Sequence, residues 1–214
     1  MIILIGGEKG GTGKTTFVTN LATLRKKAGF DVLIVDTDKQ ESANFWSAIR
    51  ESNEKLERIP CIQKYGNGIV KEVKDLANRY QDIIIDAGGR DSIELRSALA
   101  ISDKIFIPIQ ASQFDVWTLT QMNQLLTQVK AFNPEIEAYV VINRASPNPS
   151  VTEAENASEI IEDFENLEFS EVIVKDRIAY RRAASQGLSV IELEPIDKKA
   201  TDEMQNLYEK VFSK

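Results

Sequence analysis

One short segment of the chain has the residue types and the spacing that bind phosphate groups. It consists of Glu8, Lys9, Gly10, Gly11, Thr12, Gly13, Lys14, Thr15 and Thr16. These residues follow an apolar stretch of strand length and precede a helical pattern, which is the context of a phosphate-binding P-loop. Glycines allow backbone N–H groups to converge on phosphate oxygens, and the start of the helix adds positive potential. The segment from Lys9 to Thr16 is therefore predicted to bind a nucleotide, with Lys14 at the β- and γ-phosphates and Thr15 on Mg²⁺.

Two later apolar stretches end in carboxylates. Asp36 and Asp38 follow the stretch 31–35, and Asp86 follows the stretch 82–85. A carboxylate at the end of a buried strand suits the Walker B position, where it holds a Mg²⁺-bound water. For a single aspartate, a helix N-cap or a surface acid is the alternative. Two acidic strand ends together with a P-loop favour the metal site.

An amide side chain ends another apolar stretch. Asn143 follows Val141 and Ile142 and precedes Arg144. An amide can both donate to and accept from the edge of adenine, so Asn143 is a candidate nucleotide-binding residue. An asparagine that only forms a turn is the alternative.

The composition excludes several other kinds of site. The chain of 214 residues has no histidine and one cysteine, Cys61. This excludes Ser-His-Asp and Cys-His catalysis, an internal disulfide framework and a metal site built on several thiolates. The net charge is −7, so any contact with nucleic acid requires a local basic patch. The apolar run at residues 1–5 is too short for a membrane span and lacks the features of a signal peptide.

Strand-length and helix-length patterns alternate along the chain. The predicted strands, buried on both faces, are residues 2–5, 31–35, 82–85, 104–109 and 138–142. The predicted helices are residues 15–28, 68–80, 92–101, 116–132 and 197–212. The alternation predicts one α/β domain over residues 1–214, with a mostly parallel, doubly wound sheet and helices on both faces.

The last third of the chain changes in charge. Residues 150–174 contain eight acids and no basic residue, whereas residues 175–182 contain four basic residues and one acid. The four basic residues are Lys175, Arg177, Arg181 and Arg182. They form the candidate patch for phosphate contacts with DNA, together with Lys198 and Lys199. A solvated or ion-paired face is the alternative.

Two further local predictions concern helices. The loop 146–149 is followed by Ser150 or Thr152 as a predicted helix N-cap. In the final helix an apolar stripe is expected to pack against the domain. It consists of Ala200, Met204, Leu207 and Val211.

The phosphate-binding segment departs from the general P-loop pattern. Glu8 stands where that pattern has its first glycine, and Lys9 is followed by Gly10 and Gly11. A lysine followed by Gly-Gly-x-Gly-Lys-Thr resembles the signature of the ParA/MinD family of deviant Walker A ATPases. The resemblance covers residues 2 to about 194. It implies the P-loop NTPase fold, ATP and Mg²⁺ as cofactors, and a homodimer in the ATP state.

The same resemblance implies a role for Lys9 in catalysis. Lys9 would reach across the dimer interface to the phosphates of the partner's ATP and act there together with Lys14 of that site. A cation at this place stabilises charge during phosphoryl transfer, as an arginine finger does. A solvent-facing lysine beside an ordinary loop is the alternative.

The resemblance also implies roles for the carboxylates. Residues 35–40 read Val-Asp-Thr-Asp-Lys-Gln, which is similar to the family motif Asp-x-Asp-Pro-Gln with Lys39 in place of proline. Asp38 would position the attacking water as the third catalytic residue. Asp36 would support the Mg²⁺ shell, with Thr15 and Asp86 as the other metal residues.

Within the family, the chain is most similar to the short ParA partition ATPases. Residues 86–92 read Asp-Ala-Gly-Gly-Arg-Asp-Ser, and residues 177–190 contain Arg-x-x-Tyr-Arg followed by Gly-x-Ser-Val. In this group an ATP-bound dimer binds DNA non-specifically, and a centromere-binding or cargo adaptor protein stimulates hydrolysis. The resemblance therefore implies partition of plasmid or chromosome DNA, or positioning of another cargo, by a cytoplasmic, nucleoid-associated ATPase. Lys9 lies too near the start for the N-terminal helix-turn-helix domain of large ParA proteins.

Two alternatives stay open. A MinD-like ATPase would bind membrane through a basic amphipathic C-terminal helix, but residues 207–214 are short and only mildly basic, so membrane binding is not expected. A metabolic P-loop ligase or synthetase would need a site for an organic substrate, and the sequence shows no residues for one. Nitrogenase iron proteins share the loop, but their iron–sulfur cluster needs more cysteines than Cys61.

Overall fold

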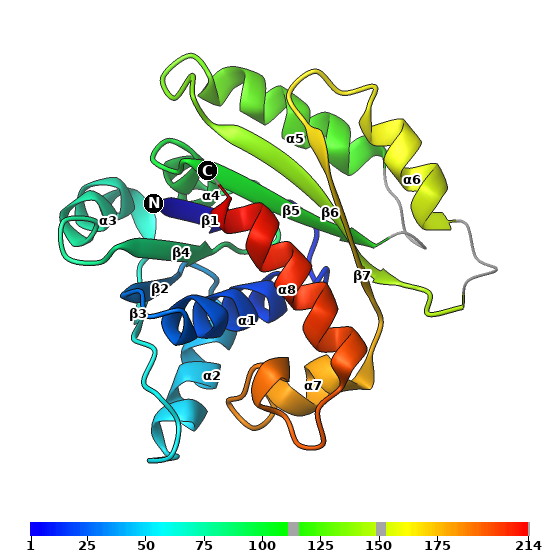
Figure 1. Ribbon diagram of the computed structural model, residues 1–214. Coiled ribbons are helices and arrows are strands. Elements are labelled where there is room, and N and C mark those ends of the chain that lie inside the picture. The colour runs from blue at the N-terminus through cyan, green and yellow to red at the C-terminus, as the bar shows by residue number, and fades with distance from the viewer. Residues whose placement is uncertain (111–115, 149–152, 214) are drawn as a thin grey trace.

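A seven-stranded sheet forms the centre of the molecule (Figure 1) in a computed structural model that describes residues 1–110, 116–148 and 153–213. The strand order is β3-β2-β4-β1-β5-β6-β7. The strands are β1 (Ile2–Ile5), β2 (Val32–Asp36), β3 (Cys61–Gln63), β4 (Asp82–Asp86), β5 (Lys104–Gln110), β6 (Glu137–Ala145) and β7 (Glu168–Lys175). All six pairings are parallel, which confirms the predicted α/β class.

The register of the sheet brings the polar strand ends together. Asp86 of β4 lies beside Ile5 of β1 on one side and beside Asp36 of β2 on the other. Across β1, Asn143 of β6 pairs with Gln110 of β5. Because parallel strands all end at the same side of the sheet, the loops that carry chemistry meet there.

Helices cover both faces of the sheet (Figure 1). One buried apolar cluster joins the sheet to α3 (Ile69–Leu76), α4 (Ile93–Leu99), α5 (Val116–Val129) and α6 (Glu153–Ile161). The other joins it to α1 (Lys14–Lys27), α2 (Ser42–Glu51), α7 (Ile178–Ala184) and α8 (Lys198–Phe212). Successive residues of β1 alternate between the clusters, with Leu4 in the first and Ile3 and Ile5 in the second. This alternation explains why the central strands read as continuous apolar runs.

All ten predicted elements are present, with some ends shifted. The predicted helix 68–80 is shorter, because a 3₁₀ turn at Gly66–Gly68 precedes α3 and the helix ends at Leu76. β3 and β7 were not predicted, since they lie at the two sides of the sheet and lack a continuous apolar run: β7 alternates buried and exposed residues. The predicted N-caps Ser150 and Thr152 lie outside the described residues.

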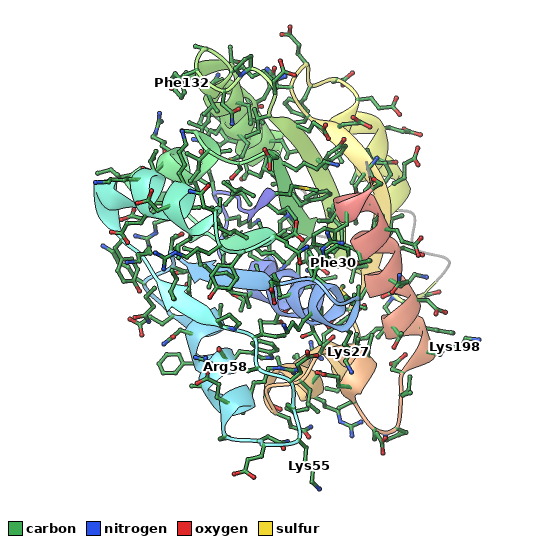
Figure 2. The ribbon with its side chains drawn as sticks, turned by 60° about the vertical axis from the view of Figure 1, so that its left-hand side comes forward. Lys27, Phe30, Lys55, Arg58, Phe132 and Lys198 are labelled. Atoms are coloured by element: carbon green, nitrogen blue, oxygen red, sulfur yellow. The ribbon has the colours of Figure 1, made fainter. Side chains whose placement is uncertain are left out.

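The last helix is packed firmly onto the domain. The apolar stripe of α8 is fully buried, as predicted; it consists of Ala200, Met204, Leu207 and Val211. Near the end of this helix, the guanidinium of Arg25 lies between the rings of Phe30 and Phe212, at 3.4 and 4.3 Å from their centroids. Figure 2 labels Phe30 beside α8. In the described part of the chain, the helices all fall short of the length and apolar character that crossing a bilayer requires.

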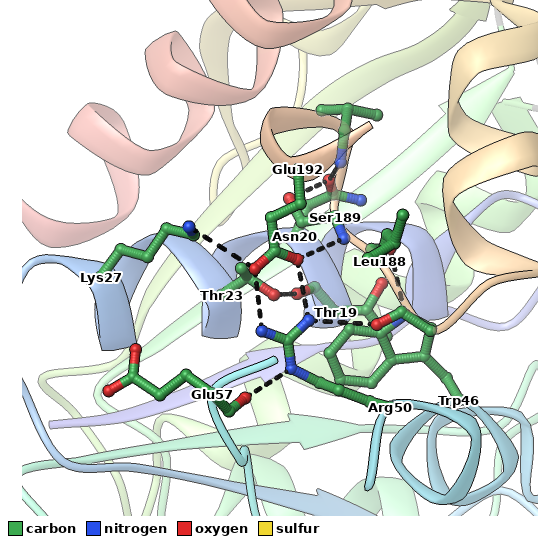
Figure 3. A network of polar contacts seen from close by, with 12 residues as sticks. Thr19, Asn20, Thr23, Lys27, Trp46, Arg50, Glu57, Leu188, Ser189 and Glu192 are labelled. Carbon is green, nitrogen blue, oxygen red and sulfur yellow. Dashed lines mark hydrogen bonds and ion pairs between the residues drawn. The ribbon is translucent and has the colours of Figure 1, made fainter. Parts of the chain in front are cut away.

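A buried polar network joins α2 to the segment that precedes α8 (Figure 3). The side chain of Arg50 is 1% exposed and forms a bidentate ion pair with Glu192, at 2.8 and 2.9 Å. Arg50 also donates to the backbone carbonyls of Glu57 and Gly187, at 2.7 and 3.1 Å. The desolvated charges are therefore fully compensated by close partners.

The same network includes α1, the helix that follows the phosphate loop. The side-chain oxygen of Asn20 accepts from the hydroxyl of Ser189 at 2.8 Å, and its nitrogen donates to the carbonyl of Thr16 at 2.7 Å. Gly187 allows the close approach, because its φ is +67° and a Cβ there would lie 2.6 Å from the backbone nitrogen of Arg50. The segment 187–192 is thus held against both α1 and α2.

We predict that Arg50→Ala lowers the free energy of unfolding by about 3–5 kcal/mol, because it removes the bidentate partner of the buried Glu192 and leaves it the longer ion pair to Lys27, at 3.6 Å. The matched control is Arg58→Ala, which removes an ion pair to Glu51 whose side chains are 74% and 43% exposed. This control should cost less than about 1 kcal/mol. Urea unfolding followed by circular dichroism measures both, and equal losses would contradict the prediction.

Candidate functional site

The phosphate-binding segment forms the turn between β1 and α1. Gly11 and Gly13 adopt left-handed backbone conformations, with φ of +75° and +97°, which glycine alone adopts without strain. Gly13 is the N-cap of α1. Since it has no side chain to cap the first N–H groups of the helix, these groups are available to an anion.

Lys14 lies folded over the loop. Its Nζ donates to the carbonyl of Lys9 at 2.8 Å, and the residue is 6% exposed. Burial lowers the pKa of Lys14, while the charges of Asp86 and Asp38 act in the opposite direction. The amine is therefore held where phosphate oxygens would approach the loop.

Thr15 and Asp86 meet where β4 ends. The Thr15 hydroxyl donates to Asp86 Oδ2 at 2.7 Å, and Asp86 is 1% exposed. Burial raises the pKa of Asp86 to about 8, although the hydrogen bond from Thr15 acts to lower it. A buried carboxyl group with so little compensation favours the approach of a cation.

The donors around Asp86 fit Mg²⁺. A hydroxyl and a carboxylate are the few protein ligands that Mg²⁺ uses when phosphates and water complete its shell. Over residues 1–110, 116–148 and 153–213, no three His, Cys, Asp or Glu side chains are grouped to hold a metal by themselves. The nucleotide would therefore supply part of the coordination.

Asp36 and Asp38 have different surroundings. Asp36 is fully buried, and its oxygens accept from the backbone N–H groups of Asp38, Ala43 and Asn44 at 3.0, 3.1 and 3.0 Å. Burial raises the pKa of Asp36, and these amides lower it. Asp36 thus anchors the loop between β2 and α2, and its part in the Mg²⁺ shell stays a prediction. Asp38 is half-buried on the cavity wall beside Gly88.

The loop after β4 packs against the phosphate loop. A Cβ at Gly89 would lie 2.6 Å from the backbone nitrogen of Gly10 and 2.8 Å from the carbonyl carbon of Lys9. No side chain fits at such a distance. The two loops therefore touch through their backbones.

Asn143 and Gln110 brace the phosphate loop from the strand ends. Asn143 Nδ2 donates to the carbonyl of Thr12 at 2.6 Å, and the residue is 5% exposed. Gln110 Nε2 donates to the carbonyl of Gly11 at 3.0 Å. The amide nitrogen of Asn143 is thus bound to the protein, and its contact with adenine stays a prediction.

An open cavity of about 640 Å³ lies over these groups, a volume typical of small-molecule sites. Its walls are the phosphate loop and the residues that follow β2 and β4. They also include three exposed cations that were not predicted as site residues: Lys39, Arg90 and Arg144. Each follows a predicted site residue or the glycines of a strand end, and that position is the sequence signal that could have identified them.

The residues of the predicted basic block differ in their surroundings in the structure. Arg177 forms an ion pair with Glu203 at 2.6 Å, and both side chains are largely buried. Contact between Arg177 and a DNA phosphate would compete with this pair, and that contact stays a prediction. Arg181 pairs with Asp176 at the surface, and Arg182 is exposed.

Comparison with known proteins identifies similar sequences. The family model "CobQ/CobB/MinD/ParA nucleotide binding domain" matches residues 3–190. The "Maintenance of carboxysome distribution protein A" of Halothiobacillus neapolitanus is 27% identical over 214 residues. That match covers 98% of this chain and 95% of the relative.

Solved structures with similar folds include two that hold nucleotides. A putative plasmid partition protein from Borrelia burgdorferi B31, bound to AMPPNP, is 21% identical with a TM-score of 0.74, over 98% of this chain and 97% of that one. The septum site-determining protein MinD of Pyrococcus horikoshii OT3, complexed with Mg-ADP, is 17% identical with a TM-score of 0.73, over 99% and 96%. At these sequence identities, the structural similarity shows a shared fold and nothing further.

We predict that Asp86 limits the stability of the nucleotide-free protein at alkaline pH. Its pKa of about 8 lies above the ordinary value of 3.8, so the free energy of unfolding contributed by this group falls as the pH rises between these values and is fully lost above them. Asp86→Asn keeps an acceptor for Thr15 without the charge. Urea unfolding should show the variant more stable than the wild type by at least about 1 kcal/mol near pH 8.5, with a smaller gain near pH 5.5.

The control for this prediction is Asp82→Asn, at the other end of the same strand. Asp82 is paired with Arg25 at 2.7 Å, so removal of its charge should lower the free energy of unfolding. A gain from Asp86→Asn that does not grow with pH would show that burial does not raise the pKa of this carboxyl group.

Proposed function

The chain belongs to the CobQ/CobB/MinD/ParA nucleotide-binding family, and we propose that it is a ParA-type, Mg²⁺-dependent ATPase that dimerises on ATP, binds DNA without sequence preference and positions a cargo. The observation that carries this proposal is the deviant loop, in which Lys9 precedes Gly10 and Gly11, two residues that line the cavity. The names of similar proteins support it, since they include a carboxysome distribution protein and a putative plasmid partition protein. The cargo would be a plasmid, a chromosome or another large assembly.

ATP would be held by its phosphates. The N–H groups of the loop and Lys14 would bind them, and Thr15 and Asp86 would hold Mg²⁺. The bound ion neutralises charge on the phosphates during transfer. Two proteins of the same fold hold AMPPNP and Mg-ADP, which supports this choice of ligands.

Asp38 is the residue that we assign to the attacking water. It lies on the cavity wall in the loop after β2, beside Gly88 of the loop after β4. Asp36 accepts from the backbone N–H of Asp38 and so fixes its position. A carboxylate held in this way can orient a water molecule and accept its proton.

Lys9 would complete the site of a second subunit. Its carbonyl is bound by Lys14 within the chain, and its side chain is half-buried next to the exposed Gly10. In a dimer joined across the nucleotides, this side chain would stabilise charge on the partner's phosphates. Hydrolysis would then depend on dimerisation.

The DNA-binding surface would lie on α7 and α8. We define it as the α7–α8 basic surface, made of Arg181, Arg182, Lys198 and Lys199, all exposed. The two helices are joined because Tyr180 donates to the carbonyl of Ala200 and to Glu203. Figure 2 shows Lys198 extending away from the ribbon at the start of α8. A centromere-binding or cargo adaptor protein would stimulate hydrolysis and release the dimer from the nucleoid.

The structure offers less support for membrane positioning. The apolar stripe of α8 is buried against the domain, and Phe212 lies against Arg25. Membrane binding by this helix would require these contacts to be broken first. The basic residues at its start remain exposed in the packed state.

We predict that ATP with Mg²⁺ converts the monomer to a dimer and that Lys9→Ala prevents this, because the Lys9 side chain would bind the partner's phosphates across the interface. Asp38→Ala should slow turnover by roughly a hundredfold or more, so it provides a background in which ATP persists. Light scattering should give the dimer mass for Asp38→Ala and the monomer mass once Lys9→Ala is added. Lys14→Ala is the control that should lose nucleotide binding itself. Dimers of the Lys9→Ala protein would disprove the trans role.

We predict that the ATP-bound dimer binds unrelated DNA sequences equally and that affinity falls with salt at a log–log slope of about −4 to −5, for roughly four to six phosphates contacted. Arg181→Ala with Arg182→Ala should flatten that slope and weaken binding. Fluorescence anisotropy at several salt concentrations measures both effects.

The matched control for DNA binding is Lys71→Ala with Lys74→Ala. These exposed lysines lie on α3, which packs on the opposite face of the sheet, and the pair changes the net charge by the same amount. Equal losses from both pairs would mean that overall charge, not the α7–α8 basic surface, determines binding. A wild-type ATP dimer that ignores DNA would disprove the partition function.

A further inference from the structure

Lys39 lies at the corner of a tight turn on the wall of the nucleotide cavity. The N–H of Glu41 closes the turn by donating to the carbonyl of Asp38 at 2.9 Å. The side chain of Asp38 also accepts from the N–H of Gln40, at 2.9 Å. These two hydrogen bonds hold the backbone that carries Lys39, while its side chain is exposed.

The backbone of this turn does not require lysine at position 39. Proline is favoured at the second position of such turns, and the family motif has proline here. Within residues 1–110, 116–148 and 153–213, no hydrogen bond uses the backbone N–H of Lys39, so proline would leave no partner unsatisfied. What lysine adds at this position is an ammonium group on a flexible stem.

The charge of Lys39 is available to an anion in the cavity. In the part of the chain that the structure describes, Lys39 forms no ion pair. Its charge nevertheless acts on Glu94, which lines the same cavity. The pKa of Glu94 is lowered by hydrogen bonds from its own N–H and from the N–H of Gly66, and also by the charge of Lys39. A phosphate group entering the cavity would meet this positive charge.

The part of the cavity beside Lys39 is rich in acids. Asp36 and Asp86 are paired in the sheet, and Asp38 lies on the adjacent wall. A triphosphate held by the phosphate loop would bring its most charged end toward these carboxylates, with Lys14 as the cation that the loop supplies. A further cation at this wall would offset the repulsion between the carboxylates and the phosphate oxygens. Lys39 meets this requirement, because it directly follows Asp38 in the turn.

We propose that Lys39 is a catalytic residue whose ammonium group contacts the γ-phosphate of the ATP bound in its own subunit. The proposal rests on the proposed function, since it requires ATP hydrolysis in this cavity. The water oxygen forms a bond to the γ-phosphorus while the bond from this phosphorus to the bridging oxygen breaks, and the electron pair leaves with ADP. Asp38 accepts the proton of the water, and Lys39 stabilises the negative charge on the oxygens of the transferred group.

Single-turnover hydrolysis with Mg²⁺, at protein concentrations that saturate the ATP dimer, tests this assignment. Lys39→Gln removes the charge and should lower the rate roughly tenfold to hundredfold. Its affinity for ATP, measured by isothermal titration, should change by less than about threefold, because the contact strengthens in the transition state. Lys39→Arg keeps a cation and should keep most of the rate. Lys39→Pro keeps the turn without the cation and should lose as much as Lys39→Gln.

Orthovanadate bound together with Mg-ADP mimics the phosphoryl group in transfer and gives a second readout. Lys39→Gln should weaken vanadate binding by about the same factor as it lowers the rate, and it should leave the affinity for Mg-ADP alone unchanged. The matched control is Lys71→Gln, which removes the same charge from an exposed lysine of α3. This control should change neither the rate nor vanadate binding, and light scattering should give the dimer mass for every variant with ATP.

Several results would overturn the proposal. A Lys39→Gln protein that hydrolyses ATP at the wild-type rate would make Lys39 a solvated side chain. An equal loss from Arg90→Gln, at another exposed cation of the cavity wall, would show that the positive potential of the whole cavity acts instead of one contact. Equal weakening of Mg-ADP and vanadate binding would exclude a role specific to the transition state. A wild-type protein that binds and hydrolyses no ATP would instead disprove the proposed function, and this inference with it.

Discussion

The parallel direction of all seven strands is the constraint on which the rest of the structure depends. Parallel strands need covered faces, so their middle residues are apolar and carry no chemistry. The polar residues are confined to the ends, and the register then determines which of them meet. Asp36 and Asp86 lie side by side for this reason, and Thr15, which follows the turn after β1, donates to Asp86. The site is therefore built from residues far apart in sequence that share one side of the sheet.

The charged groups buried in this site differ in their surroundings from the charged groups buried elsewhere in the core. Burial lowers the pKa of Lys14 and raises the pKa of Asp86, so each is held in surroundings that disfavour its charged form. Phosphates and a divalent cation would restore both charges. Arg50 and Glu192 are equally buried but compensate each other, which is the arrangement expected of a structural pair. The comparison distinguishes residues whose charges a ligand would compensate from residues that stabilise the fold.

Features that depend on local sequence patterns could be predicted, whereas features that depend on tertiary contacts could not. The loop from Lys9 to Thr16 and the central strands were predictable because their patterns are local. β7 was missed because an outer strand needs only one row of buried residues. The pairing of Arg177 with Glu203 joins residues 26 positions apart, and the left-handed backbone of Arg144, with a φ of +52°, lies at a register shift between β6 and β7. Neither has a signature in the amino-acid types alone.

The contact between Gly187 and Arg50 has a consequence for how this sequence can diverge. Gly187 leaves no room for a Cβ against the backbone of α2, and Arg50 donates to the carbonyl of that same glycine. A mutation at either position alone would be selected against, whereas paired changes that also adapt Glu192 could be tolerated. The descendants of this gene should therefore show linked variation at these three sites. The sequence of α2 should change together with the sequence of the segment that precedes α8.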